Sequence, residues 1–196
     1  MLTDSRIQLT PSETTFLRGA LDTEYQHLQF LLANGAKPLA SEFYFPTNVY
    51  TDREQFSTIT EQAESAFVAA YLAAVRRISE LGNPLLAATA AQVAVTEQVH
   101  LALIRQIGGR VPNHVSLGQA LFYNTSDAGA VLKGFLEGGS GFVKTARKLP
   151  GVTEINGVIG KDTVTSIRPF TDTTLFPDQA GSSATMAATM AATPKK

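Results

Sequence analysis

The sequence predicts a mainly α-helical protein, an antiparallel bundle of three long helices and one shorter helix, followed by an irregular C-terminal extension. Three observations predict this class. Apolar residues recur at helical spacing over three long stretches. Glycine, proline and capping residues separate these stretches. A hydrophobic content of 44% in 196 residues is enough for one sizeable core.

The first helix is predicted near residues 11–34. Thr10 or Ser12 can cap its start, and Pro11 is tolerated in the first turn. Glu24 and His27 lie in the same stripe as its apolar residues. These apolar residues are Phe16, Ala20, Leu28 and Leu31.

The segment 35–52 is predicted to be a long connection, because it holds two prolines and a cluster of aromatic residues. Gly35 and Pro38 end the preceding helix. Fully extended, the connection reaches about 60 Å. A helix of 24 residues is about 36 Å long. The connection can therefore run the full length of a bundle, as a crossover requires.

The second and third helices are predicted near 52–81 and 83–108, joined as an antiparallel hairpin. The second starts near Thr51 and Asp52. The turn LGNP combines Gly82 as C-cap, Asn83 as N-cap and Pro84 at the first helical position. The third helix is apolar on most sides, so we expect it to be central.

The rest of the chain carries weaker signals. A short fourth helix is predicted near 126–137, between Ser and Asp caps and a Gly pair. Residues 150–177, rich in Val, Ile and Thr, are interpreted as loops with a short hairpin. We therefore expect a bundle domain at 11–145, an irregular extension at 146–177 and a low-complexity flexible tail at 178–196.

Composition narrows the function. The net charge is −1, from 16 basic and 17 acidic residues, so no nucleic-acid partner is indicated. The chain has no cysteine, which leaves His and carboxylate side chains as the available metal ligands. The longest apolar run, 66–75, is too short to span a bilayer. The first ten residues lack the apolar segment of a signal peptide, and the localisation stays open.

Two similar pentapeptides, TEYQH at 23–27 and TEQVH at 96–100, interrupt apolar helical stretches. A Glu and a His three residues apart lie on one face of a helix, a spacing that metal sites in bundle cores use. Glu64 adds a third carboxylate in the middle of an apolar stripe. Buried carboxylates are costly and repel each other unless a cation neutralises them. The candidate metal ligands are Glu24, His27, Glu64, Glu97 and His100.

A single Glu-x-x-His is usually a solvated or hydrogen-bonded pair. Here two of the three His residues follow a Glu by three positions, both on apolar stripes, which favours a shared site. Other residues are weaker candidates. His114 is interpreted as a surface residue beside Pro112, and Glu61 as a solvated residue or a spare ligand. Tyr25 and Tyr71 are interpreted as core aromatic residues.

An ordered set of motifs extends over residues 13–108. E-x-x-H at Glu24 is followed by GAKP at 35–38 and by the aromatic connection FYFP at 43–46. Glu64 then precedes Tyr71 by seven, and a second E-x-x-H at Glu97 leads into Ile104 and Arg105. This set resembles the ferritin-like domain of the desiccation-related protein family.

The resemblance implies a ligand set of the di-iron carboxylate type. Ferritin-like carboxylate proteins carry a Glu on the first helix, E-x-x-H on the second, a Glu on the third and E-x-x-H on the fourth. By motif, the three long helices here correspond to the second, third and fourth. The first helix and its Glu are absent, so five of six ligands are expected. Members of the family are often exported, and a shortened gene product is one interpretation.

The resemblance implies a stress-related protein that holds iron or manganese without haem and oxidises Fe(II) or removes peroxide. The alternative is a non-enzymatic desiccation, stress or cell-surface structural protein with a vestigial metal site. The absent helix predicts an apolar groove. A second copy of the chain, residues 125–177 or a helix lost from the natural N-terminus can fill that groove, and we favour a homo-oligomer or a partner chain.

Overall fold

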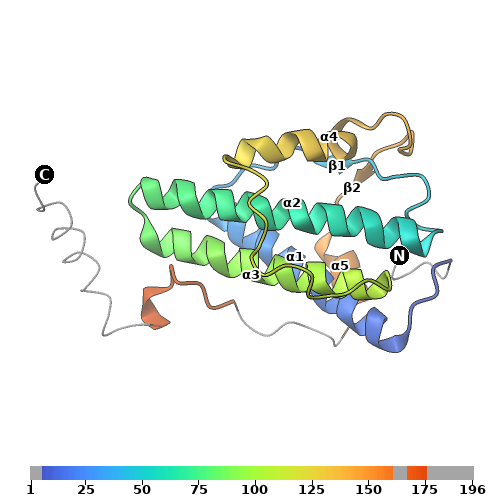
Figure 1. Cartoon of the computed structure of the whole chain (residues 1–196), viewed down its shortest axis with the longest axis horizontal. Helices are drawn as coiled ribbons and strands as arrows, with labels where there is room; N and C mark the ends of the chain where they lie inside the picture. The colour runs from blue at the N-terminus through green and yellow to red at the C-terminus, as the bar shows by residue number, and fades with distance from the viewer. Residues whose placement is uncertain (1–5, 161–166, 176–196) are drawn as a thin grey trace, which may run out of the picture.

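Three long helices form the body of the computed structural model, which describes residues 6–160 and 167–175 (Figure 1). They are α1 (Pro11–Ala33), α2 (Arg53–Glu80) and α3 (Pro84–Ile107). The 3-10 turn η1 (Thr125–Ala128) leads into the shorter α4 (Gly129–Glu137). The remaining elements are β1 (Glu42–Phe43), β2 (Arg147–Lys148), α5 (Val152–Ile159) and η2 (Thr173–Leu175). The predicted mainly α class is confirmed.

The ends of the long helices follow from local capping. Thr10 caps α1 and forms a capping box with Glu13. The Asp52 side chain accepts a hydrogen bond from the Gln55 N–H at the start of α2. Asn83 caps α3 in the same way, and Pro84 occupies its first turn. These caps place the boundaries within one residue of the predicted ones.

The helices α2 and α3 pack against each other along their length, as an antiparallel hairpin. Small side chains at the contact let the two backbones approach closely. The buried alanines of this contact include Ala66, Ala69 and Ala73 on α2 and Ala87, Ala90 and Ala94 on α3. Helix α3 also contacts α1, so it is the central helix, as its sequence predicts.

The connection after α1 runs back along the bundle to the start of α2 (Figure 1). The helices α1 and α2 both neighbour α3 and are not a closely packed pair themselves. Helix α5 packs on α1 and buries Ile155 and Ile159. Residues after 125 thus fold back onto the bundle, which was one of the three candidates for the groove. Association with a second copy stays a prediction.

Residues 152–159 correct the prediction of loops and a hairpin at 150–177. They form helix α5, whose apolar residues Val152, Ile155 and Ile159 follow a helical spacing between two glycines. Val, Ile and Thr favour strands, but packing on α1 overrides this preference. Strand β2 precedes α5 and pairs antiparallel with the distant β1, Glu42 opposite Lys148. The predicted tail at 178–196 lies outside the described residues.

A buried cluster closes the end of the bundle where α1 and α2 begin. Residues of the N-terminal segment, the crossover connection and α3 meet there, among them Ile7, Val49 and Ile107. The Arg53 guanidinium joins the same segments, because it donates to the Ile107 and Gln8 carbonyl groups and pairs with Glu13. Within the described part of the chain, no helix has the length and apolarity to cross a lipid bilayer.

Candidate metal centre

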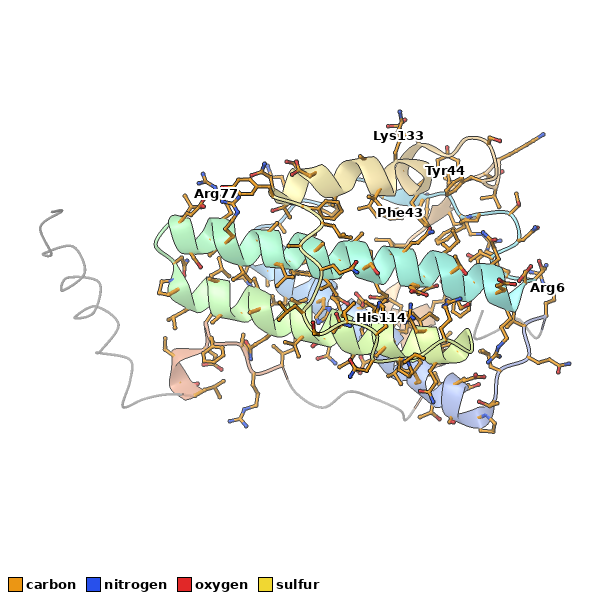
Figure 2. The ribbon with its side chains drawn as sticks, viewed as in Figure 1. Arg6, Phe43, Tyr44, Arg77, His114 and Lys133 are labelled. Carbon is orange, nitrogen blue, oxygen red and sulfur yellow. The ribbon has the colours of Figure 1, made fainter. Side chains whose placement is uncertain are left out.

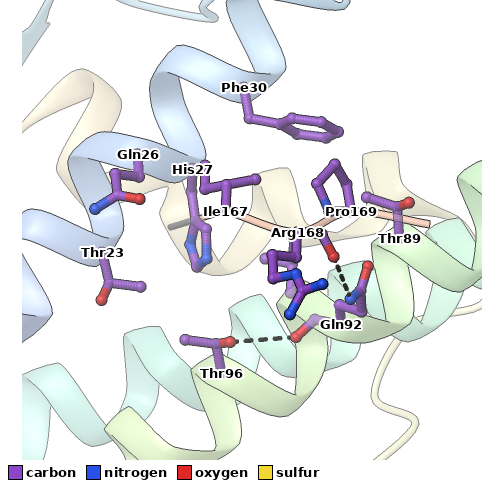
Figure 3. A pocket seen from close by; sticks show the side chains of 11 residues that line it. Thr23, Gln26, His27, Phe30, Thr89, Gln92, Thr96, Ile167, Arg168 and Pro169 are labelled. Carbon is purple, nitrogen blue, oxygen red and sulfur yellow. Dashed lines mark hydrogen bonds between the residues drawn. The ribbon is translucent and has the colours of Figure 1, made fainter. Parts of the chain in front are cut away.

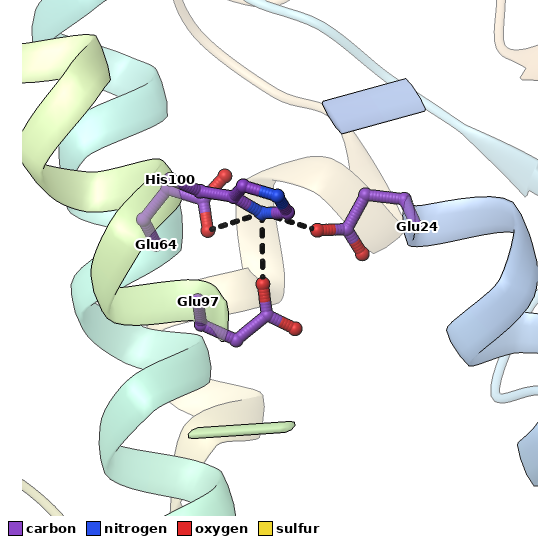
Figure 4. A group of neighbouring side chains, drawn as sticks. All are labelled: Glu24, Glu64, Glu97 and His100. Carbon is purple, nitrogen blue, oxygen red and sulfur yellow. Dashed lines mark hydrogen bonds and ion pairs between the residues drawn. The ribbon is translucent and has the colours of Figure 1, made fainter. Parts of the chain in front are cut away.

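All five predicted ligands meet in the middle of the bundle. Helix α1 contributes Glu24 and His27, α2 contributes Glu64, and α3 contributes Glu97 and His100. Figure 4 shows four of these side chains directed at one point. Each offers one ligand atom, and these atoms lie within 4.8 Å of one another: Glu24, Glu64, Glu97 and His100. His27 lies beside them, with its Nδ1 3.2 Å from Glu97 Oε1.

Glu97 is the centre of this cluster, with a side chain only 2% exposed. Its Oε1 faces His27 Nδ1 and its Oε2 faces His100 Nδ1, each at 3.2 Å. The Nδ1 atom of His100 also lies 2.9 Å from Glu24 Oε1 and 4.0 Å from Glu64 Oε2. The ring of Phe16 packs edge-on against His100. Each of the two imidazoles therefore directs its Nδ1 atom at the carboxylates.

Three polar atoms of the cluster are buried without a hydrogen bond of acceptable geometry: Glu24 Oε1, Glu64 Oε2 and His27 Nδ1. Buried polar atoms in folded proteins nearly always have a partner. Here these atoms face other carboxylate and imidazole atoms of the cluster, as Glu24 Oε1 faces His100 Nδ1 and His27 Nδ1 faces Glu97 Oε1. Carboxylate and imidazole groups suit iron and manganese as ligands. The residues present therefore fit a metal ion of this kind.

The charges in the cluster shift the pKa values of its members. Burial lowers the pKa of each imidazole, but the neighbouring Glu24 and Glu97 carboxylates outweigh it. The pKa of His27 is raised to about 9 and that of His100 to about 10. Burial raises the pKa of Glu24, yet His100 and His27 hold it well below its usual range. Burial, and then the charge of Glu97, raise the pKa of Glu64 to about 8.

These directions give the protonation of four members of the metal-free cluster at pH 7. Both imidazoles are protonated, and Glu24 is ionised. Glu64 is largely protonated. The pKa of Tyr71 is also raised, by burial and then by the charges of Glu97 and Glu24. Tyr71 therefore lies close enough for the charges of the cluster to act on it, and it remains a neutral phenol.

A small pocket of about 230 Å³, with mostly polar residue types in its lining, opens beside His27 between α1 and α3 (Figure 3). Its walls include Thr23 and Thr96, and residues 167–169 close one side. The Gln92 side chain fixes that segment, since its Nε2 donates to the Arg168 carbonyl and its Oε1 accepts from the Phe170 N–H. The pocket gives a water-compatible approach to the cluster.

Thr23 and Thr96 are residues that sequence reasoning missed. Each directly precedes the Glu of an E-x-x-H, so the full repeated motif is T-E-x-x-H. The repeated threonine was the signal that could have identified them. Both line the pocket at His27.

Two weaker candidates lie away from the cluster. Glu61 is not solvated as interpreted, because it pairs with Arg105 and Arg110 at the end of α3. His114 is exposed in the loop after α3, as predicted, and Figure 2 shows it apart from the other labelled residues.

A helical bundle with a carboxylate on each of three helices and E-x-x-H on two of them defines a ferritin-like protein. The comparison of the sequence with family models agrees. The model described as "Ferritin-like domain" matches residues 3–110, more than half of the chain, so the protein belongs to this family. Searches of curated proteins and of solved structures found no significant match.

Proposed function

We propose that this protein binds iron or manganese without haem, using Glu24, His27, Glu64, Glu97 and His100 as ligands. The observation that carries the proposal is the convergence of these side chains from three helices, with buried oxygen and nitrogen atoms that lack hydrogen bonds. Such an arrangement is costly in a protein core unless a cation neutralises the carboxylates.

The chain's own residues would determine how the site works. The three carboxylates attract a cation, and the two imidazoles add neutral nitrogen ligands once they lose their protons. When bound, iron or manganese supplies one-electron redox chemistry, which suits Fe(II) oxidation or peroxide removal. In the metal-free site the pKa of Glu64 is about 8, so this carboxyl group must release its proton to become a ligand near neutral pH.

The resemblance to desiccation-related proteins supports a role in stress. It rests on the ordered motifs from Glu24 to Arg105. Removal of reactive iron or peroxide is a chemistry that such a role needs. The subfamily and the stress role are part of the proposal, since the family match supports the ferritin-like domain alone.

A second candidate is a non-enzymatic structural or stress protein with a vestigial site. One observation that favours it is the exposure of the Glu24 side chain, which is 42% exposed although it belongs to the cluster. Among the described residues, no further carboxylate belongs to the cluster. The carboxylate and imidazole groups also pair with each other.

We also propose that the protein associates with a second copy of itself. The outer side of α3 exposes Val95 and Val99, one helical turn apart, with Val95 66% exposed. Neighbouring exposed apolar residues on one helix are typical of contact surfaces. The molar mass in solution, measured by light scattering over a range of concentrations, tests this part; a monomer at all concentrations would reject it.

The experiment that tests the metal site is metal analysis of the purified protein, followed by titration of the metal-free form with Fe(II) and Mn(II). We expect binding in the wild type and its loss in the double variant Glu24→Gln/Glu97→Gln. The matched control is Glu137→Gln/Glu154→Gln, which removes two carboxylates at exposed positions. Equal metal content in the wild type and both variants would overturn the proposal.

Oxygen and peroxide assays separate the two candidates. An active site predicts Fe(II) oxidation or peroxide consumption that the Glu24→Gln/Glu97→Gln variant lacks and the control variant keeps. Metal binding with neither activity would favour the vestigial or structural role.

A further inference from the structure

An apolar cavity of about 430 Å³ lies between α2 and α4 and shares no lining residue with the pocket at His27. Phe43 lies between these two helices (Figure 2). Six aromatic side chains line the cavity: Phe43, Phe45, Tyr50, Phe56, Phe67 and Phe135. Among the lining residues, Glu64 is the one acidic residue, and none of them is basic. A space of this size and lining is typical of sites for small molecules.

The cavity is held open by contacts that do not involve α2. The Tyr44 N–H donates to the Phe135 carbonyl at 2.8 Å, and the Val143 N–H donates to the Phe45 carbonyl at 2.8 Å. The rings of Phe135 and Phe142 pack edge to face. The crossover connection thus positions α4 at a distance from α2. The space is therefore built into the fold, whereas protein interiors otherwise leave few voids larger than a water molecule.

The volume is closer to that of a small molecule than to that of a bundle helix. A helix about 10 Å across takes roughly 120 Å³ per residue along its axis. The cavity of about 430 Å³ would hold fewer than about four helical residues. By comparison, a cavity of about 150 Å³ holds benzene. The space therefore suits a compact hydrocarbon of roughly 12 to 18 carbons.

The polar groups of the wall determine the class of the occupant. Three of the lining residues carry polar groups, Tyr50, Thr60 and Glu64, and no Lys or Arg is among the lining residues. An anionic headgroup at Glu64 would meet a carboxyl group, and the cation near the wall, Arg147, lies over the ring of Tyr50 instead, 5.1 Å from its centroid. A neutral alcohol or aldehyde can form hydrogen bonds with these three groups.

We propose that this cavity binds a neutral, mainly hydrocarbon molecule and presents its polar end to Glu64. Because Glu64 also belongs to the ligand cluster, the molecule would lie beside the metal, and this role as a substrate rests on the proposed function. Binding itself does not depend on metal. A site with a polar approach at His27 and an apolar chamber at Glu64 would receive its ion and its organic ligand from different sides.

The test uses the metal-free full chain and the neutral fluorescent probe N-phenyl-1-naphthylamine, displaced by dodecan-1-ol. Ala63→Phe fills the cavity from α2 and Leu132→Trp fills it from α4. Gln62→Phe adds the same phenyl group at the next, exposed position of α2 as the control. We expect an increase in Kd of at least about tenfold in each filling variant that keeps its helical circular dichroism, and no change in the control.

Unchanged binding in the filling variants, or no binding in the wild type, would overturn the cavity proposal. Displacement by dodecanoate as efficient as that by dodecan-1-ol would overturn the neutral class. To locate the polar end, an alcohol with a diazirine beside its hydroxyl is photolysed in the cavity, and we expect mass spectrometry to find the label on Glu64. A label confined to other lining residues would reject that orientation. Since no metal is present, these outcomes are independent of the metal titration.

Discussion

The Nδ1 atom of His100 lies 2.9 Å from Glu24 Oε1, and this contact joins α3 to α1 at the middle of the bundle. Helix α1 buries few of its own side chains, and Asp22 is its one buried residue. The charged cluster is therefore part of what holds α1 in place. Changes in its protonation should change the stability of the metal-free protein.

We predict that the cluster contributes most to the stability of the metal-free protein at about pH 4.5 and that this contribution decreases towards pH 9. The raised pKa values of His27 and His100 stabilise the fold below 6.5, and this is lost as pH rises through about 9 and 10. The stabilisation from Glu64 is lost between 4.5 and about 8. The lowered pKa of Glu24 has the opposite effect on stability. Its stabilising contribution is present above pH 4.5 and is lost as the pH falls further.

Thermal unfolding of the metal-free protein at a series of pH values measures this effect. The Glu24→Gln/Glu97→Gln variant should lose much of the decline above pH 6, since its imidazoles lack their carboxylate partners. A midpoint that rises between pH 6 and pH 9 in the wild type would contradict the prediction.

Metal binding at pH 7 should release protons. His27, His100 and Glu64 have pKa values of about 9, 10 and 8, so each holds a proton that a metal ion must displace. We expect the apparent affinity to rise with pH by roughly tenfold per unit for each displaced proton. Calorimetry in buffers with different ionisation enthalpies measures the released protons. Binding with no proton release and no pH dependence would contradict this.

Arg53 should be a stabilising residue far from the cluster. It donates to two backbone carbonyls, those of Gln8 and Ile107, and pairs with Glu13. Arg53→Met removes these bonds and should lower the free energy of unfolding by about 1–3 kcal/mol. Chemical denaturation provides the measurement. The control Arg77→Met breaks an exposed pair with Glu80 and should leave stability close to the wild type.

Ile104 should be among the most sensitive core positions. It is 1% exposed on α3, one turn after His100. Ile104→Ala leaves a cavity and should lower the free energy of unfolding by about 2–5 kcal/mol. Val95→Ala, on the exposed side of the same helix, is the control and should have little effect. Similar losses for both variants would show that Val95 is covered, as in an oligomer.

The sequence predicted the features that local rules determine. Asp52 and Asn83 mark helix starts because their side chains cap backbone N–H groups nearby in the chain. The candidate ligands were identified because a Glu and a His three apart must share a helix face. These side chains converge only if the three helices also place their ligand faces at the same level along the bundle axis. The repeated motif indicated this alignment.

Features that depend on distant packing were not predicted. Helix α5 contains strand-favouring residues and forms where it can bury Ile155 and Ile159 against α1. The pairing of Glu42 with Lys148 joins segments about a hundred residues apart, with no local signal. Residues 167–169 also line the pocket at His27 although they are far from it in the chain, and no local signal predicted this contact.

The close packing of α2 against α3 has a consequence for the order of folding. These helices are joined by the short turn at Gly82 and Asn83, so the hairpin forms through contacts that are local in sequence. It already carries Glu64, Glu97 and His100. Helix α1 must close a longer loop before it delivers Glu24 and His27. We expect the hairpin to form first as a half-site, and metal capture to complete the docking of α1.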